Sequence, residues 1–517
     1  MLRAASLALL GSLVFSGEIA RGDDLPAVPG EWVEAALVEA GANRAELGKA
    51  IAHFQEEGDR KKLVAVRFLV ANMPGKGYVI TAWKDAKGNK VEFDPLAYAD
   101  FASAEKAYDA LEKEHGTIDF VQDRLVKDLE TMKGDFLVRH VDAAFLAWEA
   151  SPPAWRVSFD AFLQYVLPYR GSEEPIDDWL GPLSERYRTL PASLGSSPDA
   201  KSIWGFLGKD VGERVRFNER YYLHPTDQGF SEMGKSGQGR CEDITNMTTY
   251  AARSRGLATA ADYTPAWGHR DNNHAWNVLL DANGRGSEPS NAHAAKVYRK
   301  TFAIQRSNLA FALPAGREAP NRFLASKSYV DVTDQYASTT DVTVPLDPVA
   351  SKDEAFAYLS VFNGGEWVAI QWARIESGKA VFSKMGRGSA GMAYLPAIHD
   401  GKTLVPAGDP LVLHKDGTVE TLAGRAAGTA LLATSVSPEQ VSVDTKVVTP
   451  ISRLKAGTTY TLSRWDRGWA KVAERVAGAE PIRFDAVPAD GLYWLVEKDS
   501  KKLERPFTIV EGRQRFW

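Results

Sequence analysis

The spacing of hydrophobic residues along the first part of the chain is that of helices. From about residue 31 to residue 204, apolar side chains recur at helical intervals, as in the run Leu137, Val141, Ala144, Phe145 and Trp148. Proline-containing breakers at 73–75 and 151–153 divide the region into short helices. Asn43 and Glu46 have the spacing of a capping box, in which two side chains bind free amides at a helix start. We therefore expect a helical N-terminal domain over residues 23–204.

After about residue 328 the spacing changes to the two-residue period of strands. Short alternating apolar runs are separated by dipeptides that favour hairpin turns: Asn363-Gly364, Asp400-Gly401 and Asp416-Gly417. The last stretch, from residue 447 to 517, has the same character. We expect an α+β protein with C-terminal β-sandwich modules at 327–440 and 441–517. The tryptophans of the last stretch are expected in strand cores, and a carbohydrate-binding platform is the alternative.

The first 22 residues have the composition of a secretory leader. Met1-Leu2-Arg3 is a short positive start, residues 4–17 are apolar, and Ala20-Arg21-Gly22 resembles a cleavage site with small residues. The apolar run is too short to span a bilayer, and no later stretch approaches about 20 uninterrupted apolar residues. We expect a signal peptide at 1–22 and a secreted or periplasmic protein with no transmembrane segment.

Composition and charge exclude some classes of partner. Of 517 residues, 44% are hydrophobic and 25% are charged, which is ordinary for a globular protein of roughly three or four domains. The formal net charge of −5 provides no broad basic surface, so nucleic acid is not an expected partner. The 9 histidines form no zinc-type pair, and we expect neither a catalytic metal nor another cofactor.

Cys241 is the only cysteine of the chain. In an oxidising compartment a thiol without a partner indicates intermolecular pairing or a reactive function, and a small buried apolar side chain is the alternative. Ile244, Met247 and Tyr250 then recur at helical spacing up to Gly256, which places Cys241 at a helix N-terminus. Amide hydrogens and the helix dipole favour a thiolate there, although the neighbouring carboxylates at 242 and 243 oppose it.

His274 follows the cysteine after a helix and a strand. Residues 258–267 have a strand pattern, 268–272 a turn and 274–280 a second strand, in which His274 shares a face with Trp276. A histidine on an apolar face is more often structural, but its place after the only cysteine favours an imidazole base. Glu288 is the preferred third residue, on condition of a bulged turn, because Asp281 falls on the other face of the strand.

Several motifs resemble the transglutaminase-like superfamily. They are Gly-Gln-Gly-Arg-Cys241, the helix end Arg-Ser-Arg-Gly-Leu257, and His274-Ala-Trp-Asn-Val. The Gly-Arg-Cys version is similar to the peptide:N-glycanase branch, and 68–75 and 166–170 resemble exported bacterial transglutaminase-like proteins. The resemblance implies a papain-like α+β core at 205–326, with a Cys-His-acid triad. The chain departs from the family at Glu288-Pro-Ser, where the family usually has Asp-Pro-Thr.

The resemblance implies a cysteine-dependent amide hydrolase that acts through a thioester, with Cys241, His274 and Glu288 as its triad. We expect Tyr263 and Trp276 to contact a polypeptide, glycopeptide or cell-wall peptide, with the flanking domains restricting access. Alternatives are a protein-crosslinking acyl transferase and a non-catalytic protein that binds glycans or cell surfaces. A papain-like protease is disfavoured, because its histidine lies about 130 to 150 residues beyond the cysteine.

Overall fold

The computed structural model describes residues 25–286, 291–441, 448–498, 500 and 504–517. The leader expected at 1–22 lies outside these residues. Within the described ranges, no helix is both long enough and apolar enough to cross a membrane.

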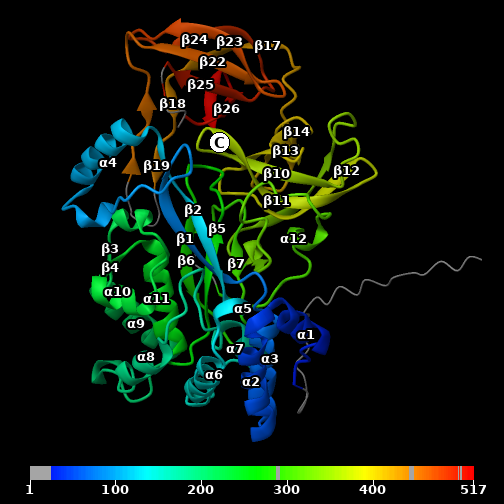
Figure 1. The fold of residues 1–517 in the computed structure, drawn as a ribbon. Coiled ribbons are helices and arrows are strands. Elements are labelled where there is room, and N and C mark those ends of the chain that lie inside the picture. The colour runs from blue at the N-terminus through cyan, green and yellow to red at the C-terminus, as the bar shows by residue number, and fades with distance from the viewer. Residues whose placement is uncertain (1–24, 287–290, 442–447, 499, 501–503) are drawn as a thin grey trace, which may run out of the picture.

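The first part of the chain folds into a helical body, as expected. Its helices are α1 (Gly30–Glu39), α2 (Arg44–Glu57), α3 (Arg60–Ala71), α6 (Gly134–Glu149), α7 (Phe159–Tyr165), α8 (Leu180–Arg186) and α9 (Ala200–Arg214). Their apolar faces form one core with α11 (Cys241–Arg253), the helix that begins at the cysteine. The helical body therefore continues without a break into the segment predicted to carry the chemistry (Figure 1).

The prediction of a capping box at the start of α2 is wrong. Asn43 makes no side-chain cap, and its Nδ2 instead donates to the carbonyl oxygens of Leu129 (3.0 Å) and Met132 (2.8 Å). The Glu46 carboxylate accepts a hydrogen bond from the amide of Gly134 at 2.8 Å. Asn43 thus binds α5 (Asp128–Thr131) and the residue after it, and Glu46 binds the first residue of α6, so both side chains satisfy backbone groups of other elements.

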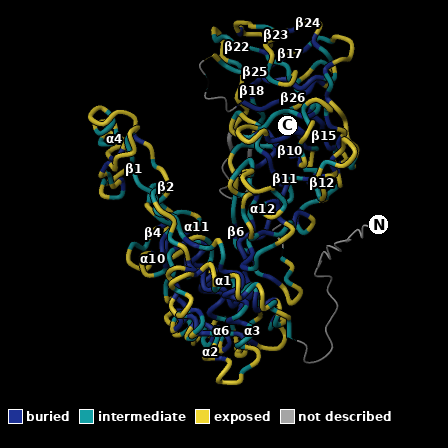
Figure 2. The backbone as a smooth tube through the Cα atoms, turned by 45° about the vertical axis from the view of Figure 1, so that its right-hand side comes forward, coloured by how far each residue is buried: buried dark blue, intermediate teal, exposed yellow. Residues whose placement is uncertain are grey.

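An arm interrupts the helical body between residues 77 and 127. It consists of β1 (Gly77–Asp85), α4 (Phe101–His115) and β2 (Ile118–Lys127), with β1 and β2 paired antiparallel. Figure 2 shows the arm projecting from the helical body. The sequence indicated only helices here. A two-stranded ribbon has few buried positions, so its alternation is faint, and packing of Trp83 against Phe93 and Phe120 holds it together.

A small antiparallel sheet packs against α11. Its order is β6 (His274–Leu279), β5 (Thr259–Thr264), β7 (Tyr298–Lys300) and β8 (Tyr329–Asp331). Gly256, at φ 69°, turns the chain from α11 into β5, and a Cβ there would lie 2.4 Å from the carbonyl oxygen of Ala147. Only glycine suits this left-handed, crowded position. β5 and β6 pair from Thr259 opposite Leu279 to Thr264 opposite His274.

The C-terminal region is β-rich, as predicted, but its strands form two nearly closed, barrel-like sheets rather than sandwiches. The first β module has β9 (Thr339–Pro345), β10 (Phe356–Asn363), β11 (Glu366–Glu376), β12 (Lys379–Gly386), β13 (Met392–His399), β14 (Leu404–Pro406), β15 (Leu411–Leu413) and β16 (Val419–Thr421). The second β module has β17 (Gly428–Ala433), β22 (Thr459–Trp465), β23 (Trp469–Val476), β24 (Ile482–Pro488), β25 (Tyr493–Glu497), β26 (Phe507–Val510) and β27 (Arg513–Phe516). Register shifts such as that after Leu359 bend the strands, which favours closure over flat stacking.

Hairpin turns in the β modules lie where the sequence placed them. Asn363 pairs with Glu366 across a turn whose central glycines, 364 and 365, have φ of 62° and 82°. The two β modules meet through aromatic rings, with Phe362 5.1 Å from Trp494 and 5.8 Å from Trp469 between ring centroids. The C-terminal tryptophans thus pack between modules.

Candidate active site

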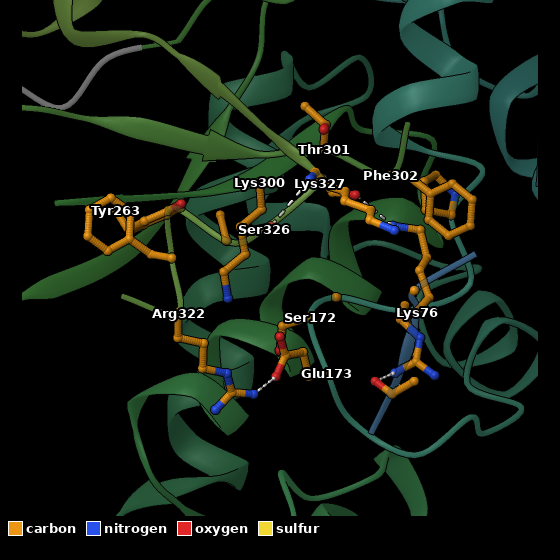
Figure 3. A pocket seen from close by; sticks show the side chains of 18 of the residues that line it. Lys76, Ser172, Glu173, Tyr263, Lys300, Thr301, Phe302, Arg322, Ser326 and Lys327 are labelled. Atoms are coloured by element: carbon orange, nitrogen blue, oxygen red, sulfur yellow. Dashed lines mark hydrogen bonds and ion pairs between the residues drawn. The ribbon is translucent and has the colours of Figure 1, made fainter. Parts of the chain in front are cut away.

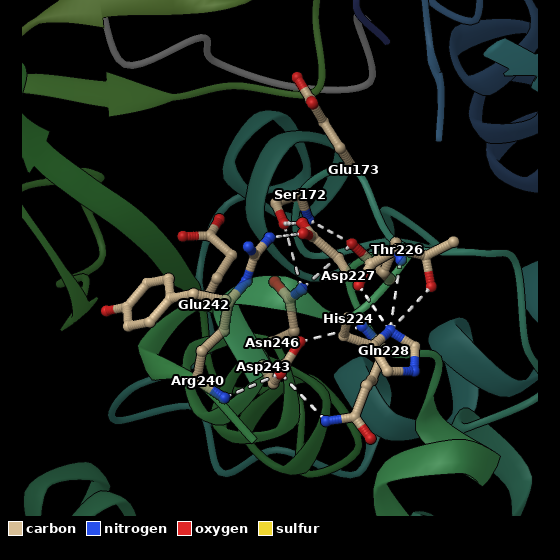
Figure 4. Close-up of polar contacts among 12 residues, drawn as sticks. Ser172, Glu173, His224, Thr226, Asp227, Gln228, Arg240, Glu242, Asp243 and Asn246 are labelled. Carbon is tan, nitrogen blue, oxygen red and sulfur yellow. Dashed lines mark hydrogen bonds and ion pairs between the residues drawn. The ribbon is translucent and has the colours of Figure 1, made fainter. Parts of the chain in front are cut away.

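The start of α11 is shaped by the carboxylate of Asp243. It accepts hydrogen bonds from the backbone amides of Arg240 and Gln228, both at 2.9 Å, and from Gln228 Nε2 at 3.0 Å (Figure 4). Asp243 is only 1% exposed. Three hydrogen bonds from amide groups therefore stabilise the negative charge of Asp243 at the start of α11.

Other supports of the helix start come from loops that precede β5 in the chain. Arg240 forms an ion pair with Asp227, and the buried Asn246 donates to Ser172 Oγ at 3.1 Å. Ser172 Oγ in turn lies 3.4 Å from the Asp227 carboxylate. The first turn of α11 is thus held by a closed set of polar contacts on the side of the helical body (Figure 4).

Cys241 itself is exposed, and its sulfur lies 3.2 Å from the hydroxyl oxygen of Tyr222. Tyr222 belongs to a short helical segment, Glu219–Leu223. Burial raises the pKa of Tyr222 to about 12, and the contact with Cys241 adds to the shift. The phenol therefore keeps its proton at neutral pH and is able to donate it in a hydrogen bond to a thiolate.

Glu242, the next residue, forms an ion pair with a lysine. Its carboxylate lies 2.6 Å from Lys300 Nζ on β7. Burial acts to raise the pKa of Glu242. The charge and hydrogen bond of Lys300 act in the opposite direction, and the net shift of the pKa is downward. The ion pair neutralises the second acidic group beside Cys241.

His274 is the first residue of β6, and aromatic rings flank its imidazole. The ring stacks on Trp276 at 5.2 Å between centroids and 23° between planes, and on Trp267 at 6.4 Å and 18°. Trp276 is 8% exposed and donates to the Tyr336 hydroxyl at 3.1 Å. Such packing restricts the imidazole plane.

The direction of β6 brings His274 to the same end of the structure as Cys241. β5 returns from the end of α11, and β6 returns along β5, so α11 and β6 run the same way. Asn277 Nδ2 sets their register, donating to the Thr245 carbonyl at 3.0 Å and to Thr249 Oγ1 at 2.8 Å. From this contact the helix rises about 6 Å to Cys241. The strand rises about 10 Å to His274.

His274 and the contact that joins β6 to α11 lie on opposite faces of the sheet. Asn277 faces α11, and strand alternation gives His274 the opposite face, which it shares with Trp276. β6 is the end strand of its sheet among the described residues.

The preferred third residue, Glu288, lies outside the described residues and stays a prediction. The chain leading to it is anchored, because the amide of Gly286 donates to Gln335 Oε1 at 3.1 Å and Arg299 donates to the Gly284 carbonyl at 2.6 Å. Asp281 closes the preceding turn, where its Oδ1 accepts the amides of residues 283 and 285, both at 2.9 Å.

The two expected substrate contacts lie on opposite faces of the sheet. Tyr263 pairs with Ala275 across β5 and β6 and lines a cavity of about 600 Å³ beside the site. Trp276 lies in a buried cluster with Trp267 and Tyr336, where its contacts are to protein groups. The geometry gives Tyr263 access to a bound molecule and gives Trp276 a part in holding His274.

The β modules hold the loop that leads to His274, residues 265–273, which we call the histidine loop. Asn363 Nδ2 donates to the carbonyl oxygens of Trp267, Arg270 and Asn272 at 3.0, 3.2 and 2.9 Å. Arg505, which is fully buried, donates to the Gly268 carbonyl at 2.6 Å and to Asp271 at 3.0 Å. No spacing pattern predicted these contacts, since the partners lie 91 to 237 residues apart in the chain.

His224 is a second imidazole near the start of α11, but its ring is engaged on both sides. Nδ1 lies 2.9 Å from the Thr226 carbonyl oxygen, and Nε2 lies 3.0 Å from the Glu232 carboxylate. Burial acts to lower the pKa of His224, and the bond to Glu232 contributes to a net rise. These contacts suit a structural residue better than a proton carrier.

In the part of the chain that the structure describes, no group of three or more His, Cys, Asp or Glu residues could hold a metal ion. A comparison with models of known protein families and with curated protein sequences finds no match for this chain.

Proposed function

We propose that this protein is an exported, cysteine-dependent amide hydrolase of transglutaminase-like type, with a papain-like core at 205–326. The observation that carries the proposal is an exposed thiol at the first residue of α11, with an imidazole at the same end of the neighbouring strand. The Asn277 contact with Thr245, which joins β6 to α11, supports this reading. Peptides, glycopeptides and cell-wall peptides carry the amides that such a site takes.

The reaction would begin with attack by Cys241 as a thiolate, its proton having passed to His274. A bond forms between sulfur and the carbonyl carbon, and the carbonyl π electrons move to oxygen. Amides at the start of α11 and the Tyr222 hydroxyl are the nearest donors for that oxyanion. The C–N bond then breaks, the nitrogen takes the proton from His274, and a thioester remains.

Water would then resolve the thioester. His274 takes a proton from the water as its oxygen attacks the carbonyl carbon, and the C–S bond breaks. The proton returns to sulfur, and the products are a carboxylic acid, an amine and free Cys241. Glu288 would orient the imidazole through its second nitrogen. Because the sulfur is exposed, a lysine amine could replace water, which gives crosslinking as the second candidate function.

Trapping of the acyl-enzyme tests the proposal. Wild-type protein, Cys241→Ala, His274→Gln and the matched control His53→Gln, an exposed histidine of α2, are each incubated with a blocked peptide library. We expect amide cleavage in wild type and His53→Gln, a loss of about 1,000-fold or more in the other two, and an acyl mass on Cys241 at low pH. Equal cleavage by Cys241→Ala would refute the enzyme and favour a non-catalytic binding protein.

A crystal structure supplies the geometric test. Cys241 sulfur and a His274 ring nitrogen should lie within about 4 Å of each other, allowing for the looser geometry of a free enzyme. Glu288 should face the other nitrogen. A sulfur-to-nitrogen separation of more than about 8 Å, with the histidine loop in place, would rule out direct proton transfer between them.

A further inference from the structure

The cavity beside the candidate active site has a wall that is rich in positive charge. It measures about 600 Å³ and lies between the base of the arm, strands β5 and β7, and the segment 322–328 (Figure 3). This volume is within the range of small-molecule and peptide-side-chain sites, about 300 to 1,000 Å³. Six cations line it among the described residues: Lys76, Arg170, Arg253, Lys300, Arg322 and Lys327. Glu173 is the carboxylate among the described lining residues.

Four of these cations are bound to other groups of the protein. Arg170 pairs with the buried Asp128, Lys300 with Glu242, and Arg322 with Glu173. Arg253 donates to backbone carbonyl oxygens, including that of Pro168 at 2.9 Å. These four side chains therefore already have protein partners. Arg253 thus has neutral partners, and among the described residues the two lysines, Lys76 and Lys327, likewise form no ion pair with a carboxylate.

Lys76 has no carboxylate within ion-pair distance in the described part of the chain. Its Nζ lies 3.3 Å from Ser328 Oγ and 4.5 Å from the centre of the Phe302 ring. Burial lowers the pKa of Lys76 to about 8, with Asp128 opposing the shift and Arg170 adding to it. A bound anion would stabilise the charged form of such a lysine. Lys327, exposed at the rim, likewise forms no ion pair among the described residues.

The cavity adjoins the segments that carry the proposed catalytic pair through two of its lining residues. Lys300 on its wall binds Glu242, the neighbour of Cys241 in the chain. Tyr263 on its wall pairs with Ala275, the neighbour of His274. A molecule in the cavity would therefore lie beside the first turn of α11, which carries the thiol.

We propose that this cavity binds the carboxylates of an acidic peptide, and that it thereby selects substrates for the site at Cys241. The second clause rests on the proposed function. Lysine ammonium groups act as point charges that suit single carboxylates, whereas the planar forks that favour phosphate belong to arginines already engaged. The apolar parts of Tyr263 and Phe302 would pack against the aliphatic part of an acidic side chain.

Calorimetric titration of the full chain tests the proposal in a Cys241→Ala background, where nothing is turned over. The probes are N-acetylated triglutamate amide, its triglutamine counterpart and inorganic phosphate. We expect triglutamate to bind, triglutamine to bind at least about tenfold more weakly, and the double change Lys76→Met with Lys327→Gln to weaken triglutamate about tenfold. Met has a similar length without the charge, so it can occupy the place of Lys76 beside the Phe302 ring. Lys352→Gln, an exposed lysine outside the cavity, is the matched control and should bind like its parent.

Equal binding of triglutamate and triglutamine, or undiminished binding by the double variant, would overturn the proposal. Binding of phosphate without triglutamate would also overturn it in favour of a free-anion site. If the double variant fails to fold, Lys327→Gln alone, at the exposed rim, should still weaken triglutamate about threefold. The titration and the trapping experiment can fail separately. If triglutamate does not bind but the acyl-enzyme forms, only the acidic-peptide site is refuted. If triglutamate binds but no acyl-enzyme forms, only the proposed enzymatic function is refuted.

Discussion

The two halves of the proposed catalytic pair are held by different parts of the molecule. The start of α11 is fixed by residues that precede β5, chiefly Asp243 and Gln228, within the core of the helical body. The histidine loop is held from the other side by Asn363 and Arg505, which belong to the β modules. The proposed nucleophile is thus built into one core, whereas the position of the proposed base depends on contacts with a distant part of the chain.

This difference gives the β modules a role that their sequence does not suggest. We expected the flanking domains to restrict access to the site, and that stays a prediction. The contacts of Arg505 add a second role, because they connect the second β module to the histidine loop and to Phe362 of the first. Loss of docking should therefore disable the histidine and spare the cysteine.

The largest effect is expected from Arg505→Ala. The change removes a buried cation, leaves the Gly268 carbonyl without this donor, and leaves the Asp271 carboxylate with the Gly364 amide but without its ion pair. We expect the free energy of unfolding to fall by about 3 to 5 kcal/mol, with amide cleavage lost and labelling of Cys241 by a small alkylating reagent retained. Thermal unfolding and peptide mass spectrometry measure these outcomes. Arg513→Ala, which changes an exposed arginine on β27, is the control. An equal loss of stability and cleavage in that variant would contradict a specific role of Arg505 in holding the histidine loop.

Asp243→Ala tests the opposite half. Three hydrogen bonds to a buried carboxylate are lost at the start of α11, and the Arg240 and Gln228 amides are left unpaired. We expect a loss of about 2 to 3 kcal/mol in the free energy of unfolding and slower alkylation of Cys241, with protection of the histidine-loop amides in hydrogen exchange unchanged. Deprotection of that loop would show that the two halves are coupled.

Acid should destabilise the helical body through His140. This histidine is buried on α6, with Nε2 2.8 Å from the Leu167 carbonyl oxygen, and burial lowers its pKa to about 4. Because the unfolded chain binds a proton near pH 6.5 and the folded chain does not, stability falls as pH drops from about 6.5 towards 4. The contribution between pH 7 and 5 is about 2 kcal/mol. Denaturant unfolding should show this slope in wild type and a shallower one in His140→Gln. Identical slopes would exclude His140 as the cause.

Tyr222→Phe should have the smallest effect. It removes the hydroxyl 3.2 Å from the sulfur and keeps the ring, which is about half exposed. We expect stability to change by less than about 1 kcal/mol and cleavage to fall about tenfold if the hydroxyl stabilises the oxyanion. Steady-state kinetics should show the loss in kcat rather than KM. A gain in rate would instead mean that Tyr222 shields the sulfur.

The sequence predicted local features well and distant contacts poorly. The helix start at Cys241, the strand at His274 and the turn at Asn363 follow from spacing and turn chemistry within about ten residues. Two contacts could not be predicted in this way: the ion pair of Lys300 with Glu242, and the hydrogen bond of Arg505 to the histidine loop. Each joins segments that only the folded chain brings together. Asn43 shows the same limit, because its predicted local cap gave way to a contact 86 residues away.

The rate at which iodoacetamide alkylates Cys241 at pH 6.5 tests most directly whether His274 acts on this cysteine. Wild type, His274→Gln, Arg505→Ala and the control His53→Gln are compared by mass spectrometry of the Cys241 peptide. If an imidazole takes the thiol proton, His274→Gln should slow alkylation about tenfold. Arg505→Ala should resemble it, and the control should match wild type. Equal rates in wild type and His274→Gln would contradict the account.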